Sequence, residues 1–145
     1  MKICVGADHR GTAYKELVKA ILCERGHEIE DMGVYSDGPA DFPDYAFNVA
    51  KAVQSGAADR GVLICASGIG MSMAANRFRG IRATLCLTPQ MAVTARRHND
   101  SNILCLGQDT VSEQEVRNIL EAWLDTEFEG GRHERRLARL DCVPD

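Results

Sequence analysis

The stretch GVLICASGIG at residues 61–70 changes character halfway along, and this change decides the fold class. Its first half, GVLIC, is an unbroken apolar run and gives the strongest strand signal in the chain, because strands covered on both faces have this pattern. Its second half, ASGIG, is a glycine-rich turn that leads into a helix of small residues around residues 71–76. A buried strand that passes directly into a helix is the repeating unit of parallel α/β sheets.

The same unit recurs along the chain. Apolar runs predict further strands at residues 2–7, 27–32, 81–87 and 102–106. Helical spacing or helix caps mark segments between and after them, at residues 14–22, 46–53, 88–89, 112–124 and 132–140. The segment 33–44 carries Asp37, Gly38 and Pro39 and is predicted to be a loop. We therefore predict an α/β fold in a single domain over residues 1–145, with a five-stranded parallel sheet between two helical layers and a C-terminal helix and tail from about residue 130.

Charge and hydropathy narrow the functional class. The 145 residues include 17 Lys and Arg against 21 Asp and Glu, a net charge of −4. This balance argues against a broad nucleic-acid surface and against a basic membrane contact. No apolar run approaches the roughly 18 residues that cross a bilayer, and Asp8 interrupts the N-terminal run too early for a signal peptide. We expect a cytoplasmic protein that binds neither nucleic acid nor membrane.

The six cysteines do not form a metal or disulfide framework. No Cys-x-x-Cys pair is present, which excludes zinc-ribbon and thioredoxin-type motifs. Cys23 and Cys142 receive no role. Three others lie inside apolar runs and are expected to fill the core as small hydrophobic residues: Cys4, Cys86 and Cys105. Cys65 differs from them because it closes the strongest strand.

Three polar features are expected where such a sheet places its ligand, at the carboxyl ends of the strands. Asp8 and His9 follow the first strand, and Cys65 ends the third. The glycines after Cys65 allow close approach of backbone to a ligand, and the N–H groups at the start of the next helix favour negative charge there. The third feature is RHND at residues 97–100, in which His98 is suited to proton transfer near neutral pH. Position alone leaves open a structural role for Cys65 and a surface or helix-capping role for His98.

The C-terminal helix carries a basic stripe. Arg132, Arg135, Arg136 and Arg139 share one helical face, and with Glu134 they give a local charge of +3 in an acidic protein. Such a stripe is usually solvated, and we assign that role to Arg135 and Arg139. Guanidinium groups match phosphate oxygens in bidentate geometry, so a phosphate on a small ligand accounts for the stripe.

Together these features resemble one family. The motifs are GADHRG at residues 6–11, LICASGIGMS at 63–72, AANR at 74–77, RHND at 97–100 and GGRH at 130–133. In this order they are similar to the B-type ribose-5-phosphate isomerases, a family that also includes galactose-6-phosphate and allose-6-phosphate isomerases. The resemblance runs from residue 2 to about residue 140. It implies a Rossmann-like α/β/α protomer, a homodimer with active sites at the subunit interface, and no metal or cofactor. Pairing of dimers into a tetramer stays open.

The resemblance also implies roles for individual residues. Cys65 matches the base that moves a proton between C2 and C1 through a cis-enediolate, and His98 matches the residue that opens the sugar ring. Ser67 keeps the hydroxyl of a threonine found in many members and joins this catalytic set. The residues that match substrate-binding positions are Asp8, His9, Ala66, Ser67, Gly68, Ile69, Gly70, Asn99, Arg132 and Arg136. Among them, the N–H groups of residues 66–70 match an anion hole, while His9, Arg132 and Arg136 match phosphate ligands.

One position departs from the family pattern. Members often carry an arginine that binds phosphate two residues after the glycine of the fifth strand, and this chain has Asp109 there. An acid would weaken that contact or redirect specificity, and Arg10 is a candidate to compensate for it.

The leading hypothesis is interconversion of ribose 5-phosphate and ribulose 5-phosphate. Asp109 motivates the first alternative, isomerisation of a six-carbon sugar 6-phosphate such as allose or galactose 6-phosphate. A non-enzymatic phosphate- or nucleotide-binding regulatory module is the second alternative, and it would leave Cys65 and His98 without a function. A receiver-like signalling domain shares the order of elements but needs an aspartate where Cys65 stands.

Overall fold

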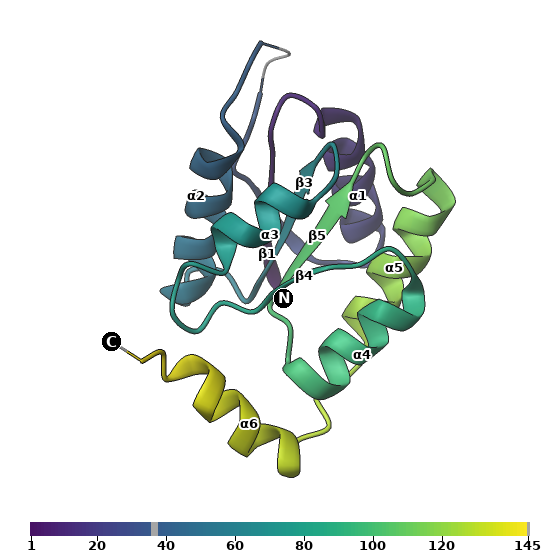
Figure 1. Cartoon of the computed structure of the whole chain (residues 1–145). Coiled ribbons are helices and arrows are strands. Elements are labelled where there is room, and N and C mark those ends of the chain that lie inside the picture. The colour runs from purple at the N-terminus through teal and green to yellow at the C-terminus, as the bar shows by residue number, and fades with distance from the viewer. Residues whose placement is uncertain (36–37, 145) are drawn as a thin grey trace.

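The computed structural model describes residues 1–35 and 38–144, so Asp37 of the predicted loop lies outside the described residues (Figure 1). The strands are β1 (Lys2–Ala7), β2 (Glu28–Asp31), β3 (Arg60–Cys65), β4 (Ala83–Leu85) and β5 (Ile103–Gly107). The helices are α1 (Thr12–Glu24), α2 (Phe42–Gln54), α3 (Ile69–Ala75), α4 (Pro89–Asn99), α5 (Glu113–Asp125) and α6 (Arg132–Asp141). The predicted alternation of five strands with helices is confirmed.

Two predicted boundaries were wrong. The segment predicted as a loop to residue 44 ends earlier, because α2 begins at Phe42 with Pro43 in its first turn, where a missing N–H costs nothing. The strand predicted at residues 81–87 is reduced to the three residues of β4. The chain then turns into α4, whose Thr88 side chain accepts a hydrogen bond from the N–H of Met91.

The sheet is fully parallel, with strand order β2-β1-β3-β5-β4. The apolar strands β1, β3 and β5 form its centre, and the short strands β2 and β4 form its edges. In register, Ala7 lies beside Ile64, and Cys65 lies beside Gly107. The three central strands therefore end at nearly the same level, which brings the loops after them together.

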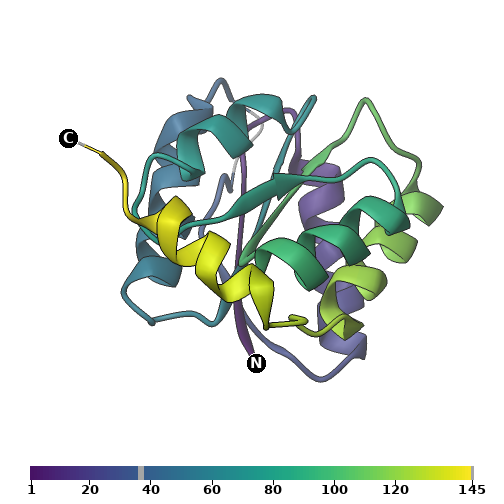
Figure 2. The same ribbon diagram turned by 60° about the horizontal axis from the view of Figure 1, so that its bottom comes forward.

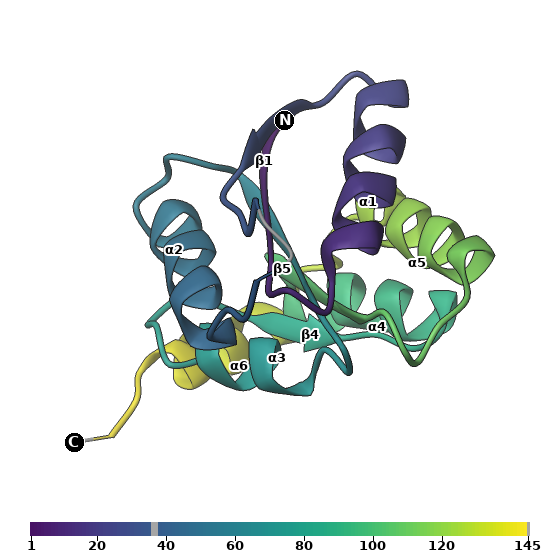
Figure 3. The same cartoon turned by 90° about the horizontal axis from the view of Figure 1, so that it is seen from above.

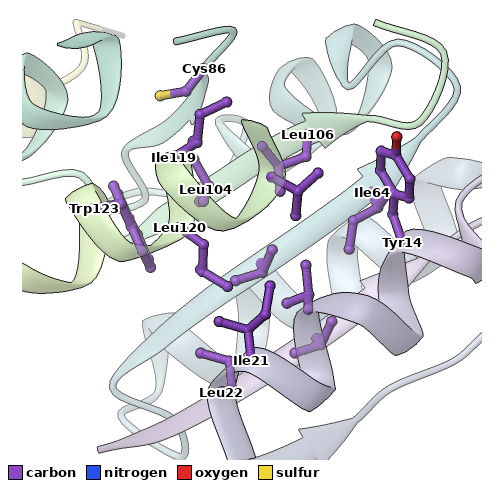
Figure 4. Close-up of a cluster of buried hydrophobic side chains, with 14 of the residues drawn as sticks. Tyr14, Ile21, Leu22, Ile64, Cys86, Leu104, Leu106, Ile119, Leu120 and Trp123 are labelled. Carbon is purple, nitrogen blue, oxygen red and sulfur yellow. The ribbon is translucent and has the colours of Figure 1, made fainter. Parts of the chain in front are cut away.

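Two hydrophobic layers cover the sheet, giving the predicted α/β/α arrangement (Figure 3). Helices α1, α4 and α5 pack on one face, where Trp123 and Leu120 of α5 meet Ile21 and Leu22 of α1 above the strands (Figure 4). Helices α2 and α3 pack on the other face. The three cysteines predicted for the core are fully buried, and their burial raises the pKa of Cys4 and of Cys86 to about 12 and that of Cys105 well above its ordinary value.

Helix α6 stands apart from this sandwich, below the sheet in the view of Figure 1 and across the end of α4 in Figure 2. Leu137 and His133 are its buried side chains, and Asp141 binds the Arg82 guanidinium at 3.0 Å just before β4. All four arginines of the basic stripe are exposed. Among the described residues, no helix combines the length and apolar character that crossing a bilayer requires.

Candidate active site

As predicted, Asp8 and His9 follow β1 and Cys65 ends β3, so all three lie where the carboxyl ends of the strands meet. We call this end of the sheet the carboxyl edge and the opposite end, where the strands begin, the amino-terminal edge. The Asp8 carboxylate is buried and accepts the N–H of Arg10 at 2.9 Å, while its own N–H donates to the carbonyl of Ile64 at 3.2 Å. The N–H and the carbonyl oxygen of Ala40 lie 3.1 and 3.3 Å from Nδ1 of His9 and hold the ring in place. The loop after β1 thus holds one carboxylate and one imidazole beside the end of β3.

The Cys65 thiol is enclosed by the loop that follows it. Only 6% of the residue is exposed, and its Sγ accepts the N–H of Gly68 at 3.0 Å. Gly68 has φ = 77°, and a Cβ there would lie 2.7 Å from Leu85 Cδ1 and 3.0 Å from the Leu106 carbonyl carbon. Only glycine combines this positive φ with the lack of a Cβ that the close contacts require. Its left-handed conformation turns the N–H toward the sulfur. A hydrogen bond from N–H to sulfur favours a sulfur that carries negative charge.

The loop after β5 supports the loop after β3 from behind. The N–H groups of Gln108 and Asp109 donate to the carbonyls of Cys65 and Ala66, both at 2.9 Å. Ser67 Oγ accepts the N–H of Ile69 at 3.2 Å. These bonds fix the backbone of residues 65–69, from which an anion hole would be built.

Asp109 forms an ion pair with Arg10, with 2.9 Å between Oδ2 and Nη2. The acid at the position where the resemblance implies an arginine is therefore paired with an arginine of the loop after β1. Both side chains are more than half exposed, so the pair is solvated and can exchange partners.

His98 and Asn99 lie at the opposite edge of the sheet, so the expectation that residues 97–100 share the carboxyl edge was wrong. Helix α4 runs antiparallel to the strands and returns the chain to their amino-terminal ends before β5 begins. The Asn99 carbonyl accepts a hydrogen bond from Arg82 Nε, which precedes β4, at 2.9 Å. The length of β5, roughly 13 Å at about 3.3 Å per residue, separates this segment from the level of Cys65.

Helix α6 joins His98 at this amino-terminal edge. The rings of His98 and His133 are stacked, with centroids 4.6 Å apart and 14° between planes. Burial lowers the pKa of His133, and the neighbouring His98 lowers it further. Arg132 and Arg136 extend from the same helix into solvent.

The site residues therefore form two groups within one chain. The carboxyl-edge group contains Asp8, His9 and the segment 65–70. The amino-edge group contains His98, Asn99, Arg132 and Arg136. Two hollows of about 350 and 330 Å³ flank the edge strand β4, and Asn99 lines both.

Comparison with known proteins decides the family. The family model described as Ribose/Galactose Isomerase matches residues 3–140. The chain belongs to the ribose/galactose isomerase family. It is 44% identical over 142 residues to ribose-5-phosphate isomerase B of Escherichia coli K12, covering 98% of this chain and 95% of that relative.

Solved structures of ribose/galactose isomerase relatives have the same fold. A ribose 5-phosphate isomerase from Thermotoga maritima is 48% identical with a TM-score of 0.95, and the match covers 98% of each chain. The type B ribose 5-phosphate isomerase of Trypanosoma brucei is 43% identical with a TM-score of 0.96, covering 99% of this chain and 98% of that one. The predicted Rossmann-like fold and family membership are confirmed.

Two neighbours of His98 in this ribose/galactose isomerase chain were not predicted. His133 appeared only as part of the GGRH motif, and Glu129, which precedes that motif, received no role. Glu129 Oε2 lies 3.9 Å from His98 Nε2. Helical spacing cannot reveal this contact, because it joins two residues that are 31 positions apart in the chain.

Proposed function

We propose that this protein interconverts ribose 5-phosphate and ribulose 5-phosphate. The observation that carries the proposal is the Cys65 thiol, held at the carboxyl edge of the sheet against the Gly68 N–H at 3.0 Å. The names of the relatives supply the substrate, since ribose-5-phosphate isomerases of three organisms match nearly the whole chain.

In the proposed reaction His98 first assists opening of the sugar ring. The Cys65 thiolate then removes the proton from C2, and the electron pair moves through C1 to the carbonyl oxygen to give a cis-enediolate. Of the N–H groups of residues 66–70 that match the anion hole, those of Ala66, Ser67 and Gly70 stabilise the developing charge directly, while those of Gly68 and Ile69 donate to Cys65 Sγ and Ser67 Oγ and must change partner to join them. The thiol returns the proton to C1 while a proton moves from O2 to O1, which gives the ketose. Arg132 and Arg136 hold the phosphate, and this remote binding energy fixes the reacting carbons.

The separation of the two groups supports a site shared by two copies of the chain. Within one copy, Cys65 and His98 lie at opposite edges of the sheet. A two-fold axis across the edge strand β4, perpendicular to the strands, reverses the strand direction in the second copy. The carboxyl-edge group of one copy then faces the amino-edge group of the other, and the symmetry forms two such sites.

The surface around β4 suits this association. Four large apolar side chains are exposed on α3, on the turn before α4 and in the first turn of α4: Ile69, Met73, Leu87 and Met91. Ile69 adjoins the Cys65 loop, while Met91 shares α4 with His98. A second copy seated here would cover apolar surface next to both groups. We place this homodimer in the cytoplasm, because six free thiols suit a reducing compartment.

Coexpression of two inactive variants tests the shared site. Cys65→Ala and His98→Asn should each lose turnover of ribose 5-phosphate. In a mixed dimer one site carries both substitutions and the other carries neither. Random pairing makes half of the dimers mixed, so the mixture should recover about one quarter of the wild-type activity. A mixture as inactive as its parents would show that one chain supplies the whole site, and turnover by Cys65→Ala alone would refute the role of the thiol.

The Arg10–Asp109 ion pair favours a second candidate substrate class, the six-carbon sugar 6-phosphates. It removes one cation from the rim of the carboxyl-edge group and so changes where a phosphate can bind. Values of kcat/KM for ribose 5-phosphate, allose 6-phosphate and galactose 6-phosphate, measured with and without a chelator, decide between the classes. A higher value for either hexose phosphate would overturn the ribose assignment.

A further inference from the structure

Three metal-ligating side chains from separate segments converge at the amino-terminal edge of the sheet. They are His98 near the end of α4, Glu129 in the segment before α6, and His133 in the first turn of α6. One ligand atom of each lies within 4.8 Å of the others, and Glu129 Oε2 lies 3.9 Å from His98 Nε2. Figure 2 shows the end of α4 beside the start of α6.

The buried member of this cluster lacks a partner. His133 is 5% exposed, and its Nε2 has no hydrogen-bond partner among the described residues. A buried imidazole nitrogen without a partner costs free energy, because folding removes its bond to water. Because no hydrogen bond holds the ring at this nitrogen, the ring can turn to bind a ligand that enters between His133 and its two neighbours.

The chemistry of the three side chains selects the ligand. Two imidazoles and one carboxylate are a common zinc set that leaves a fourth position for water, whereas Mg²⁺ and Ca²⁺ prefer oxygen ligands. We propose that His98, Glu129 and His133 bind a divalent transition-metal ion of the zinc class, and that this ion inhibits the enzyme reversibly.

Side-chain movements are needed to complete the geometry. Zinc bonds of about 2.0–2.2 Å at tetrahedral angles place two ligand atoms about 3.3–3.6 Å apart, so ligand atoms up to 4.8 Å apart must approach one another and the stacked rings must rotate. The exposed fractions of the His98 and Glu129 side chains are 45% and 56%, so both can turn toward the fixed His133. The hydrogen bond from the Glu129 N–H to the Arg97 carbonyl, 3.0 Å long, keeps the carboxylate near the rings. Arg132 and Arg136 of the same helix carry positive charge and weaken the binding of a cation.

The metal would inhibit the enzyme because it would bind a nitrogen of His98 that the reaction uses. This half of the inference rests on the proposed function. A metal bound to His98 Nε2 takes the lone pair that ring opening needs. Zinc should therefore slow turnover of cyclic ribose 5-phosphate, and a chelator should restore it. Metal binding itself does not depend on the reaction.

The experiment measures binding and turnover separately. The protein is first freed of metal with a chelator, which is then removed. Zn²⁺ is titrated into a mixture of this protein and a chromophoric chelator that competes for the ion, and Mg²⁺ is the control ion. A Cys23→Ser/Cys142→Ser background removes the two exposed thiols. We expect one zinc ion per chain. The zinc affinity of Glu129→Gln and of His133→Asn should be at least about tenfold weaker than that of the background protein. His27→Asn is the matched control, because this histidine lies beside Met1 and should leave zinc affinity unchanged.

Each outcome has one meaning. Equal zinc affinity in the background protein and in Glu129→Gln overturns the site, and this exposed substitution keeps the fold even if His133→Asn does not. Binding without inhibition of ribose 5-phosphate turnover overturns the inhibitory half alone. Absence of turnover in the metal-free enzyme overturns the proposed function instead, because the chelator competition still reports on the site.

Discussion

Replacing Gly107 by alanine should damage the active site through a single methyl group. A Cβ at this position would lie 2.6 Å from the carbonyl carbon and oxygen of Ser67, and 2.4 Å from Thr110 Oγ1. The Thr110 side chain can rotate away, but the Ser67 backbone cannot. The methyl group therefore pushes the loop after β5 away from the loop that encloses Cys65.

The size of the effect follows from these distances. Ordinary contacts of a Cβ begin at 3.4 Å, so the two loops must separate by about 0.8 Å. This strains the hydrogen bonds that Gln108 and Asp109 donate to the β3 loop, both 2.9 Å long. Overpacking of this kind costs about 1–3 kcal/mol of the free energy of unfolding. A displacement near 1 Å in a group that positions the reaction costs about a hundredfold in rate.

Gly61→Ala provides the matched control. It lies at the other end of β3, and its Cβ would meet Val49 Cγ1 at 2.5 Å, again an overpacked contact. Urea titration should show both variants destabilised by about 1–3 kcal/mol. The isomerase assay, corrected for the folded fraction, should show a loss of kcat only for Gly107→Ala. Wild-type kcat in Gly107→Ala, or an equal loss in both variants, would refute the link between this loop contact and catalysis.

Two further predictions concern stability and thiol reactivity. Burial raises the pKa of Asp31, but hydrogen bonds from Lys19 and Lys15 outweigh it and lower the pKa below its ordinary value. The carboxylate therefore stabilises the fold above its unfolded pKa of about 4, and this stability is lost as the pH falls through the folded pKa. Asp31→Asn should remove about 3 kcal/mol near neutral pH and flatten the acid limb of the unfolding free energy. Iodoacetamide at mildly alkaline pH should first modify the exposed Cys23 and Cys142. Mass spectrometry should find the core thiols of Cys4, Cys86 and Cys105 unmodified, because burial both raises their pKa and blocks access of the reagent.

Controls separate these effects from general unfolding. An acid limb unchanged in Asp31→Asn would show that the ion pairs with Lys15 and Lys19 do not govern acid stability. Modification of a core thiol as fast as Cys23 in the native protein would contradict the packing described for that core. Denatured protein should react at all six cysteines.

The sequence predicts the elements well where one local cause dominates. Unbroken apolar runs predicted β1, β3 and β5, since these strands are buried on both faces. The capping residue Ser112 predicted the start of α5, and its Oγ accepts the N–H of Glu115 at 3.2 Å. The edge strand β4 was predicted too long, because apolar pattern does not record where a strand loses its neighbours.

The candidate site was predicted less completely, because it depends on which segments meet in space. Cys65 and the loop after it are contiguous in sequence, so their pattern predicted their position. His98 was placed at the wrong edge, although a helix that follows a parallel strand must return the chain to the strands' amino-terminal ends. Glu129 gave no local signal and His133 appeared only within the GGRH motif, since their contact with His98 arises only when α6 packs on α4.

The opposite placement of Cys65 and His98 has a consequence for how activity scales with protein amount. A single folded chain contains all residues of the proposed site, but it cannot bring them together into a complete site. Below the dissociation constant of the pair, the rate would rise with the square of the enzyme concentration, so halving expression would cut turnover about fourfold. Dilution alone would then switch the enzyme off, while each chain kept its fold.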